Sequence, residues 1–335
     1  MSLIAQSTMP SMSGSNLRTL ALCIPAYNAA RHLPRILGSA QKQLIPFDET
    51  IVYDDASTDE TRQVAESFGA RVIRGERNLG CTWGRKILAE DVRSDWIHFH
   101  DADDDMKENF TTLAHAWMGK PNAPDVILFN YDWVELDTGR LVGQTRFIKN
   151  KAEEDPILFT LETQVNPFCG LYKTTKFLEA GGPDTDPEVS QCEDIAMHCK
   201  LARKGLKFSV ERDLAIINYL VPGSMSRSPD SYKKLIAAIY TTYQKAFTLL
   251  KSNGRYEDYK KAIGLRMWQH TRHAAWVSQW EYVKKSIFLA KECGVTCPSD
   301  DSKSFQILCR FEPLLAVVAR ELFNRIRRKP GAYWY

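Results

Sequence analysis

The sequence predicts an α/β protein with a mostly parallel, Rossmann-like sheet, helices on both faces of that sheet, and a C-terminal helical region. Three observations predict this class. Short apolar runs alternate with amphipathic helical patterns up to residue 129, the order that strand–helix–strand units produce. Polar clusters follow the apolar runs, as they do at the carboxyl ends of parallel strands. After Pro229 strand signals stop and helical periodicity takes over.

Five segments are expected to form strands, because each is short, apolar and bounded by polar or turn-forming residues. These segments are 20–24, 50–53, 71–74, 96–100 and 125–129. Helices are expected between them, over about 32–43, 57–68 and 78–92. Ser57 to Glu60 has the composition of a helix start, with small hydroxyl residues before acidic first-turn residues.

The rest of the chain is expected to add one helix and two strands to the sheet before the helical region begins. The helix runs from Glu193 to about Lys204 and stops at Gly205. The two strands are 206–210 and 215–219. Amphipathic helices are expected over 230–293 and 302–328. The predicted division is therefore a disordered leader at 1–16, an α/β domain at 17–228 and a helical extension at 229–335.

The composition is that of an ordinary globular protein. The 335 residues are 44% apolar and 25% charged, and the net charge of +3 is too small to indicate a nucleic-acid partner. No apolar run approaches the roughly 20 residues of a membrane-spanning helix. The eight cysteines include no CxxC pair and are expected to be free thiols. These features predict a cytoplasmic protein, or one that lies on the cytoplasmic face of a membrane.

Four aspartates directly follow the fourth predicted strand, at positions 101, 103, 104 and 105. Two carboxylates about 5 Å apart repel by roughly 3 kcal/mol, so the cluster needs an opposing charge. In an extended segment Asp101 and Asp103 point the same way, and both can face one hard cation such as Mg²⁺ or Mn²⁺. Asp104 and Asp105 are expected to cap a helix that starts near Lys107.

Five short motifs together carry a family resemblance. They are 23–28, 53–61, 78–85, 100–104 and 192–194. In order and spacing they make residues 19–228 resemble the family 2 glycosyltransferases, which bind nucleotide sugars in a GT-A fold. The resemblance implies a metal-dependent, inverting transfer of a sugar from a nucleotide-diphosphate donor, with a UDP-sugar expected, to a hydroxyl acceptor. The cofactor would be Mn²⁺ or Mg²⁺.

The resemblance also implies a set of residues at the nucleotide sugar. They are Pro25, Tyr27, Asn28, Asp55, Asn78, Gly80, Arg85, Asp101, Ala102 and Asp103. Asp101 and Asp103 would hold the metal. Tyr27 offers a stacking face, Asp55 can accept from a base or a ribose hydroxyl, and Arg85 can offset diphosphate charge.

On the acceptor side, the resemblance assigns the general base to Asp194. A hydroxyl is a poor nucleophile and needs a positioned proton acceptor in the transition state. The alternative is that Glu193 and Asp194 are only favoured by the helix dipole. His198 is expected to be a packing residue. Further candidates for contacts to the acceptor or the diphosphate are Gly182, Asp184, Glu193 and Arg227.

Two features of the helical region leave alternatives open. Trp268, Arg272, Trp276 and Trp280 recur every four residues, which suits core packing better than an aromatic sugar platform. The segment from Leu314 to Lys329 is a basic amphipathic helix, which can lie on an anionic membrane or dock on the protein with a solvated basic tail.

The expected partners are a nucleotide-sugar donor and a glycan or lipid-linked acceptor, in cell-surface polysaccharide or glycolipid synthesis. Two rival readings remain. A sugar-1-phosphate nucleotidyltransferase would show a Gly-rich loop after the first strand, where this chain has Pro25 to Asn28. A catalytically silent sugar-nucleotide-binding protein would lack some of the acids needed for turnover, and this chain has them all.

Overall fold

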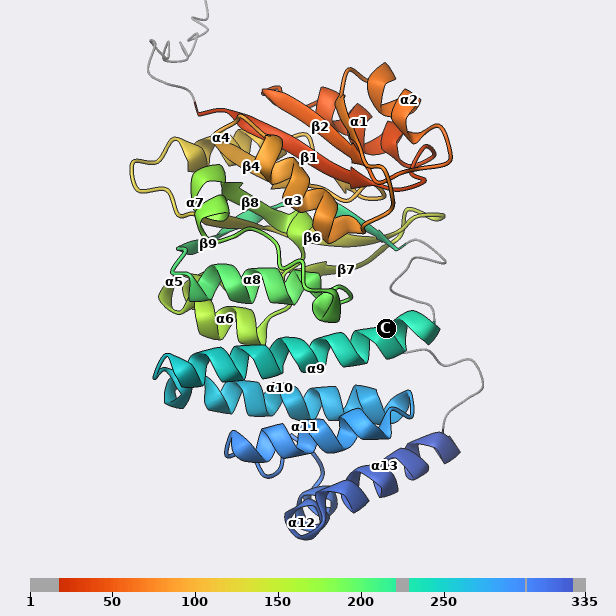
Figure 1. Cartoon of the computed structure of the whole chain (residues 1–335), viewed down its shortest axis with the longest axis vertical. Helices are drawn as coiled ribbons and strands as arrows, with labels where there is room; N and C mark the ends of the chain where they lie inside the picture. The colour runs from red at the N-terminus through yellow and green to blue at the C-terminus, as the bar shows by residue number, and fades with distance from the viewer. Residues whose placement is uncertain (1–17, 221–228, 299, 328–335) are drawn as a thin grey trace, which may run out of the picture.

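The computed structural model describes residues 18–220, 229–298 and 300–327. The α/β part and the C-terminal helices stack along the long axis of the molecule, with the sheet at one end and α13 at the other (Figure 1). The predicted leader, Arg227 and the terminal aromatic residues 333–335 lie outside the described residues.

The first half of the sheet is parallel, as predicted. Its strands are β1 (Leu20–Ala26), β2 (Glu49–Asp54), β3 (Arg71–Arg74) and β4 (Trp96–Phe99), in the order β3-β2-β1-β4. The helices between them are α1 (Leu33–Gln41), α2 (Thr61–Ser67) and α3 (Cys81–Asp91). β1 is buried along its whole length, which explains its continuous apolar run.

The second half of the sheet is mixed. Its strands are β5 (Asp105–Met106), β6 (Val126–Glu135), β7 (Leu141–Thr145), β8 (Gly170–Lys173) and β9 (Phe208–Leu220). β8 lies between β4 and β6 and is antiparallel to both. β9 is parallel to β6, with register shifts around Asn130, and replaces the two separate strands predicted at 206–210 and 215–219. The α/β fold class is confirmed, with a sheet that is curled and mixed.

Two local expectations are wrong. α2 starts at Thr61, so residues 57–60 do not supply an acidic first turn. Asp59 instead accepts hydrogen bonds from the backbone N–H groups of Ala30 and Thr61, which ties the start of α2 to the loop after β1. The tryptophan repeat also crosses a helix boundary, because one helix ends at Trp276 and the next begins at Trp280.

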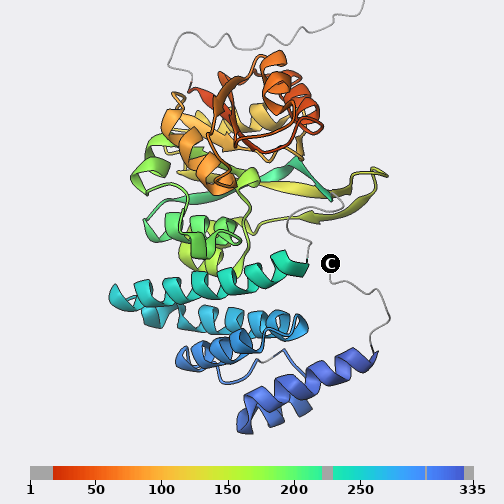
Figure 2. The ribbon, with the colours of Figure 1, turned by 45° about the vertical axis from the view of Figure 1, so that its right-hand side comes forward.

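Six short helices complete the α/β part. They are α4 (Phe110–Met118), α5 (Lys149–Glu154), α6 (Pro156–Glu162), η1 (Pro167–Cys169), α7 (Thr174–Glu179) and η2 (Pro187–Val189). A longer helix, α8 (Glu193–Arg203), matches the predicted bounds closely. α5, α6 and α8 lie between the sheet and the C-terminal helices (Figures 1 and 2).

The C-terminal region is helical, as predicted. Its helices are α9 (Pro229–Ser252), α10 (Tyr256–Trp276), α11 (Trp280–Glu292), α12 (Lys303–Phe311) and α13 (Pro313–Arg327). α9 is fixed to the α/β part by the Tyr243 hydroxyl, which donates to the carbonyl of Leu161 over 2.9 Å, and by an ion pair between Lys245 and Asp186. Trp268 is 1% exposed and donates to the carbonyl of Val295, so this tryptophan is a core residue and no sugar platform.

Candidate active site

The carboxyl ends of β1, β2 and β4 meet at one edge of the sheet, because these neighbouring strands are parallel. The topology therefore brings together the polar segments that follow them, near residues 25–28, 54–55 and 100–105. The N-terminus of α3 packs beside this edge, since α3 crosses β1 and β2 (Figure 1). In open α/β sheets this edge is where ligands bind.

Asp55 is buried and positions the loop before α3. Its Oδ1 accepts from the N–H of Leu79 over 2.8 Å, and its Oδ2 accepts from the N–H of Gly80 over 2.7 Å. Gly80 has a φ of +89°, a backbone conformation that favours glycine. Each carboxylate oxygen has a second lone pair, so Asp55 can still accept from a ligand while it holds this loop.

Pro25, Tyr27 and Asn28 have different surroundings. Pro25 packs under α3, where a Cβ added to Gly84 would lie 3.0 Å from the Pro25 Cβ. Tyr27 is 50% exposed, so its ring face is open to a planar partner. Asn28 has a φ of +48° and accepts from the N–H of Thr58, which identifies it as a turn residue. Of the three, Tyr27 is the aromatic side chain that is open to solvent.

Arg85 pairs with two protein carboxylates. Its buried guanidinium donates to Asp101 Oδ1 over 2.7 Å and to Glu193 Oε1 over 3.2 Å. The side chain thus supplies a positive charge to one carboxylate that follows β4 and to one at the start of α8. Asn78, next to this region in the sequence, is exposed.

The four aspartates divide between two environments. Asp101, Ala102 and Asp103 are partly exposed at the sheet edge. Burial, and to a lesser extent the negative charge of Asp101, raise the pKa of Asp103.

Asp104 and Asp105 do not cap a helix, contrary to prediction. Asp104 is buried and accepts from the Asn218 side chain over 2.7 Å and from the N–H of Tyr219 over 2.8 Å. Asp105 opens the short strand β5, which pairs with β9, and α4 begins only at Phe110. Residues 105–106 pair with the edge of β9 and are therefore in a strand and not at the start of a helix.

The carboxylates of Asp101 and Asp103 fit a divalent cation by their chemistry. Mg²⁺ and Mn²⁺ prefer carboxylate oxygens and usually keep waters and substrate phosphates as further ligands. Within residues 18–220, 229–298 and 300–327, no group of three or more His, Cys, Asp or Glu side chains has the geometry of a metal site. A cation at this pair would need the rest of its ligands from water and substrate.

Asp194 lies at the start of α8 and has two hydrogen-bond donors. The Gln164 amide donates to its Oδ2 over 2.7 Å, and the N–H of Ile195 donates to its Oδ1 over 2.8 Å. Burial raises the pKa of Asp194 to about 7, and the negative charge of Glu193 adds to the rise. A carboxylate with such a pKa is a stronger base than an exposed aspartate and is still substantially ionised at neutral pH.

His198 is a packing residue, as predicted, and it fixes α8 to the sheet. Its Nδ1 lies 2.8 Å from the carbonyl oxygen of Asp194, and its Nε2 lies 2.8 Å from the hydroxyl of Tyr172 on β8. Burial lowers the pKa of His198 to about 4, so the ring is neutral. No sequence signal points to Gln164 or Tyr172, because their partners are distant in the chain and come together only in the fold.

The predicted acceptor-side segment forms a tight turn. Gly181 and Gly182 have φ values of +88° and +56°, and Lys200 donates to the carbonyl of Gly181 over 2.7 Å. Asp184 accepts from the N–H of Asp186 over 3.2 Å, so at least one of its oxygens serves the turn. Arg227, the remaining candidate on this side, lies outside the described residues.

The sequence of the chain is similar to those of known glycosyltransferases. The sequence profile of glycosyl transferase family 2 matches residues 21–178. An uncharacterized glycosyltransferase of Haemophilus influenzae is 36% identical over 88 residues, which are 25% of this chain and 29% of that protein. The poly(ribitol-phosphate) beta-N-acetylglucosaminyltransferase TarS of Staphylococcus aureus is 26% identical over 206 residues, 58% of this chain and 34% of TarS. The chain thus spans about a third of the length of these curated relatives.

The fold of the chain is similar to the folds of solved glycosyltransferase structures. The crystal structure of S. aureus TarS 1–349 has a TM-score of 0.57 at 20% identity and covers 90% of this chain and 82% of its own. A mannosyltransferase from Pyrobaculum calidifontis, solved with GDP-Man and Mn²⁺, has a TM-score of 0.52 at 14% identity and covers 93% and 89%.

The fold of the chain is therefore similar to that of solved GT-A glycosyltransferases. Residues 21–178 belong to glycosyl transferase family 2. The family resemblance expected from the five sequence motifs is confirmed.

Proposed function

We propose that the protein is an inverting, metal-dependent glycosyltransferase that moves a sugar from a nucleotide-diphosphate donor to a hydroxyl acceptor. The observation that carries this proposal is Asp194, a carboxylate with a raised pKa whose neighbour Glu193 shares the Arg85 guanidinium with Asp101. The contacts of Arg85 support the proposal, because they link the start of α8, which carries the proposed base, to Asp101, which is proposed to hold the metal.

In the proposed reaction Asp194 accepts the proton of the acceptor hydroxyl as its oxygen attacks the anomeric carbon of the donor sugar. The bond from that carbon to the diphosphate oxygen breaks in the same displacement, which inverts the configuration. The hydrogen bonds from Gln164 and the N–H of Ile195 hold the carboxylate in one orientation. Asp101 and Asp103 would hold Mn²⁺ or Mg²⁺, which supplies charge stabilisation for the leaving diphosphate when bound.

The donor is proposed to be a UDP-sugar. TarS structures with UDP and with UDP-GlcNAc are among the similar folds, and the mannosyltransferase with GDP-Man makes a GDP-sugar the competing choice. The acceptor is proposed to be a glycan or a lipid-linked glycan of cell-surface polysaccharide or glycolipid synthesis. We place the enzyme in the cytoplasm, with contact to the membrane through its C-terminal helices. Among the described residues no helix is both long and apolar enough to cross a bilayer.

A donor panel tests the proposal. The protein is incubated with UDP-GlcNAc, UDP-glucose or GDP-mannose, with Mn²⁺ or with a chelator, and nucleotide release is measured together with Asp194→Asn. We expect release from one donor only, dependent on metal and lost in the variant. Binding of a donor without any release, with acceptors supplied, would instead support a silent binding protein. Pyrophosphate formation from a sugar phosphate and a nucleoside triphosphate would indicate the nucleotidyltransferase.

A further inference from the structure

The helix α13 has apolar side chains on two opposite faces, and only one of these faces is covered. Ala316 and Val317 point into the protein and are buried. Leu315, Leu322 and Ile326 follow one another at intervals of seven and four residues, which places them on a single face at 3.6 residues per turn. They are 52%, 58% and 84% exposed.

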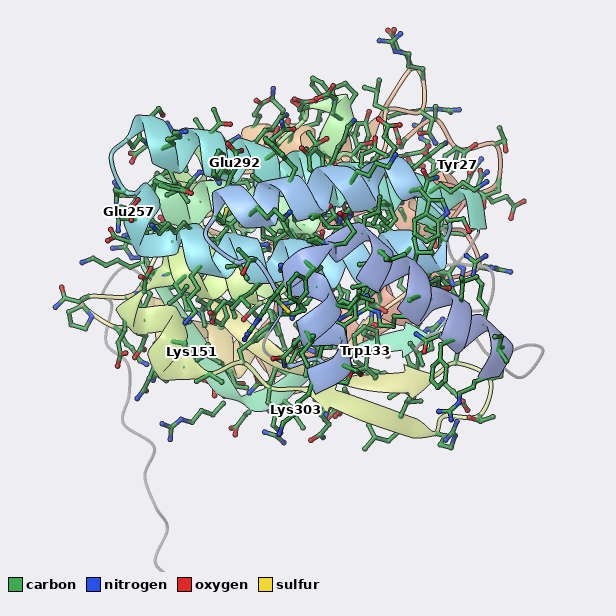
Figure 3. All side chains as sticks on the ribbon, turned by 90° about the horizontal axis from the view of Figure 1, so that it is seen from below. Tyr27, Trp133, Lys151, Glu257, Glu292 and Lys303 are labelled. Atoms are coloured by element: carbon green, nitrogen blue, oxygen red, sulfur yellow. The ribbon has the colours of Figure 1, made fainter. Side chains whose placement is uncertain are left out.

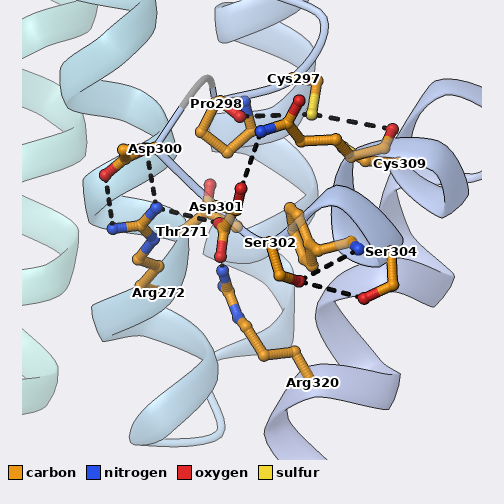
Figure 4. A network of polar contacts seen from close by, with 12 residues as sticks. Thr271, Arg272, Cys297, Pro298, Asp300, Asp301, Ser302, Ser304, Cys309 and Arg320 are labelled. Carbon is orange, nitrogen blue, oxygen red and sulfur yellow. Dashed lines mark hydrogen bonds and ion pairs between the residues drawn. The ribbon is translucent and has the colours of Figure 1, made fainter.

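A network of ion pairs fixes which face of α13 points inward. Asp301 Oδ2 accepts from Arg272 of α10 over 2.9 Å and from Arg320 of α13 over 2.8 Å (Figure 4). Arg272 also contacts both oxygens of Asp300. Because Arg320 is held from inside, α13 cannot rotate to bury its outer face without breaking this network.

The preceding helix, α12, also carries exposed apolar side chains. Ile307 and Phe311 of α12 are four residues apart, on one face of that helix, and Phe311 is 82% exposed. α12 and α13 are connected by a single residue and lie at the end of the molecule farthest from the sheet (Figures 1 and 3). We call Ile307, Phe311, Leu315, Leu322 and Ile326 the outer apolar set.

The charges around this set are mainly positive. Residues 303–327 contain five lysines and arginines against two glutamates. Arg320 pairs inward with Asp301 and Arg325 pairs with the buried Glu321, which leaves Lys303, Arg310 and Arg327 against Glu312. Lys303, Arg310 and Arg327 are exposed. A basic helix pair with an unburied apolar face has the composition of an interfacial membrane anchor, in which the long cationic side chains reach the headgroups.

We propose that α12 and α13 bind an anionic lipid surface through the outer apolar set, with Lys303, Arg310 and Arg327 at the headgroups. The positive charge favours anionic lipid over a second copy of this chain, because two such faces would bring like charges together. The inference deepens the proposed function, from which it takes the lipid-linked acceptor, and it specifies the face by which the enzyme meets the membrane.

Vesicle sedimentation of the full chain tests this proposal without any sugar donor. The protein is mixed with phosphatidylcholine vesicles that contain or lack phosphatidylglycerol. We expect binding to the anionic vesicles, at least about tenfold weaker binding to neutral ones, and a further loss on raising the salt concentration. The triple variant Leu315→Asn, Leu322→Asn, Ile326→Asn should bind anionic vesicles at least about tenfold more weakly.

Two controls separate this inference from its alternatives. Leu44→Asn removes a side chain that is equally exposed but lies in the loop between α1 and β2, and should leave vesicle binding unchanged. Asp194→Asn should also bind vesicles normally, so a failure of sugar transfer leaves the membrane result intact. Wild-type protein that ignores anionic vesicles, or a triple variant that binds them as well as wild type, overturns the proposal. So does a dimer in light scattering that the triple variant abolishes, because the face would then be a protein interface.

Discussion

Replacing Asp194 by asparagine should separate catalysis from stability. The variant keeps the size of the side chain and keeps one oxygen for the N–H of Ile195, but it removes the charge beside Glu193. We expect transfer to fall by about 10²–10⁴-fold, the usual contribution of a general base. In the wild type, transfer should rise as the pH passes about 7, because Asp194 must lose its proton to act.

Stability should depend on pH in the opposite direction to transfer, because ionisation of Asp194 destabilises the folded protein. The pKa of Asp194 rises on folding from its ordinary 3.8 to about 7, so folding favours the protonated carboxyl. Its contribution to stability is fully present below pH 4 and is lost as the pH rises through 7. A rise in pKa of about three corresponds to about 4 kcal/mol, an upper limit because Glu193 shares the repulsion.

The Asp194→Asn side chain does not titrate, so the difference in unfolding free energy between variant and wild type isolates this carboxyl. The introduced amide faces the Gln164 amide and can cost about 1–3 kcal/mol, but that cost does not change with pH. The unfolding free energy of the variant minus that of the wild type should be measured by denaturant unfolding at pH 4 and at pH 8. We expect this difference to increase by up to about 4 kcal/mol from pH 4 to pH 8. Parallel pH–stability curves, or wild-type turnover by the variant, would refute the reasoning.

Two further substitutions have matched controls nearby. Gly84→Ala puts a Cβ 2.9 Å from the Tyr53 ring and should destabilise the protein by about 1–3 kcal/mol in thermal unfolding, whereas Gly38→Ala in α1 meets no atom within 4 Å and should be neutral or slightly stabilising. Equal melting shifts for the two would show that α3 can move off β2. Asp55→Asn leaves one of two N–H groups facing an amide donor and should weaken donor binding several-fold, by about 1 kcal/mol or more. Asp54→Asn keeps the bond to the N–H of Ser57 and should bind donor normally, and weak binding by both variants would contradict this assignment.

The sequence predicts the first half of the sheet well because its signals are local. Each strand from β1 to β4 is a short apolar run, and each loop after it carries polar residues at the carboxyl end. The second half depends on pairing that local patterns do not reveal. β8 is four residues long and is defined by its place between β4 and β6, and β5 exists because β9 offers a free edge.

The site shows the same limit. The motifs indicate Asp101, Asp194 and Arg85 by residue type, and the fold does bring Asp101 and the start of α8 onto one guanidinium. Residue type cannot show that Arg85 is occupied by protein carboxylates, because Asp101 and Glu193 are separated by 92 positions (193 minus 101). The sequence also does not reveal that Asp55 holds the loop before α3. Its donors there are backbone N–H groups, which have no sequence signature.

The sharing of Arg85 restricts how this site can change by mutation. Asp101 and Glu193 are each held by a different nitrogen of the same buried guanidinium, so loss of either carboxylate leaves the cation with a single counter-charge. The effects of substituting the two acids should therefore fail to add, although the structure records no direct bond between them. A change at any one of these three positions should therefore alter the requirements at the other two, so that the loop after β4, α3 and the start of α8 are coupled through one guanidinium.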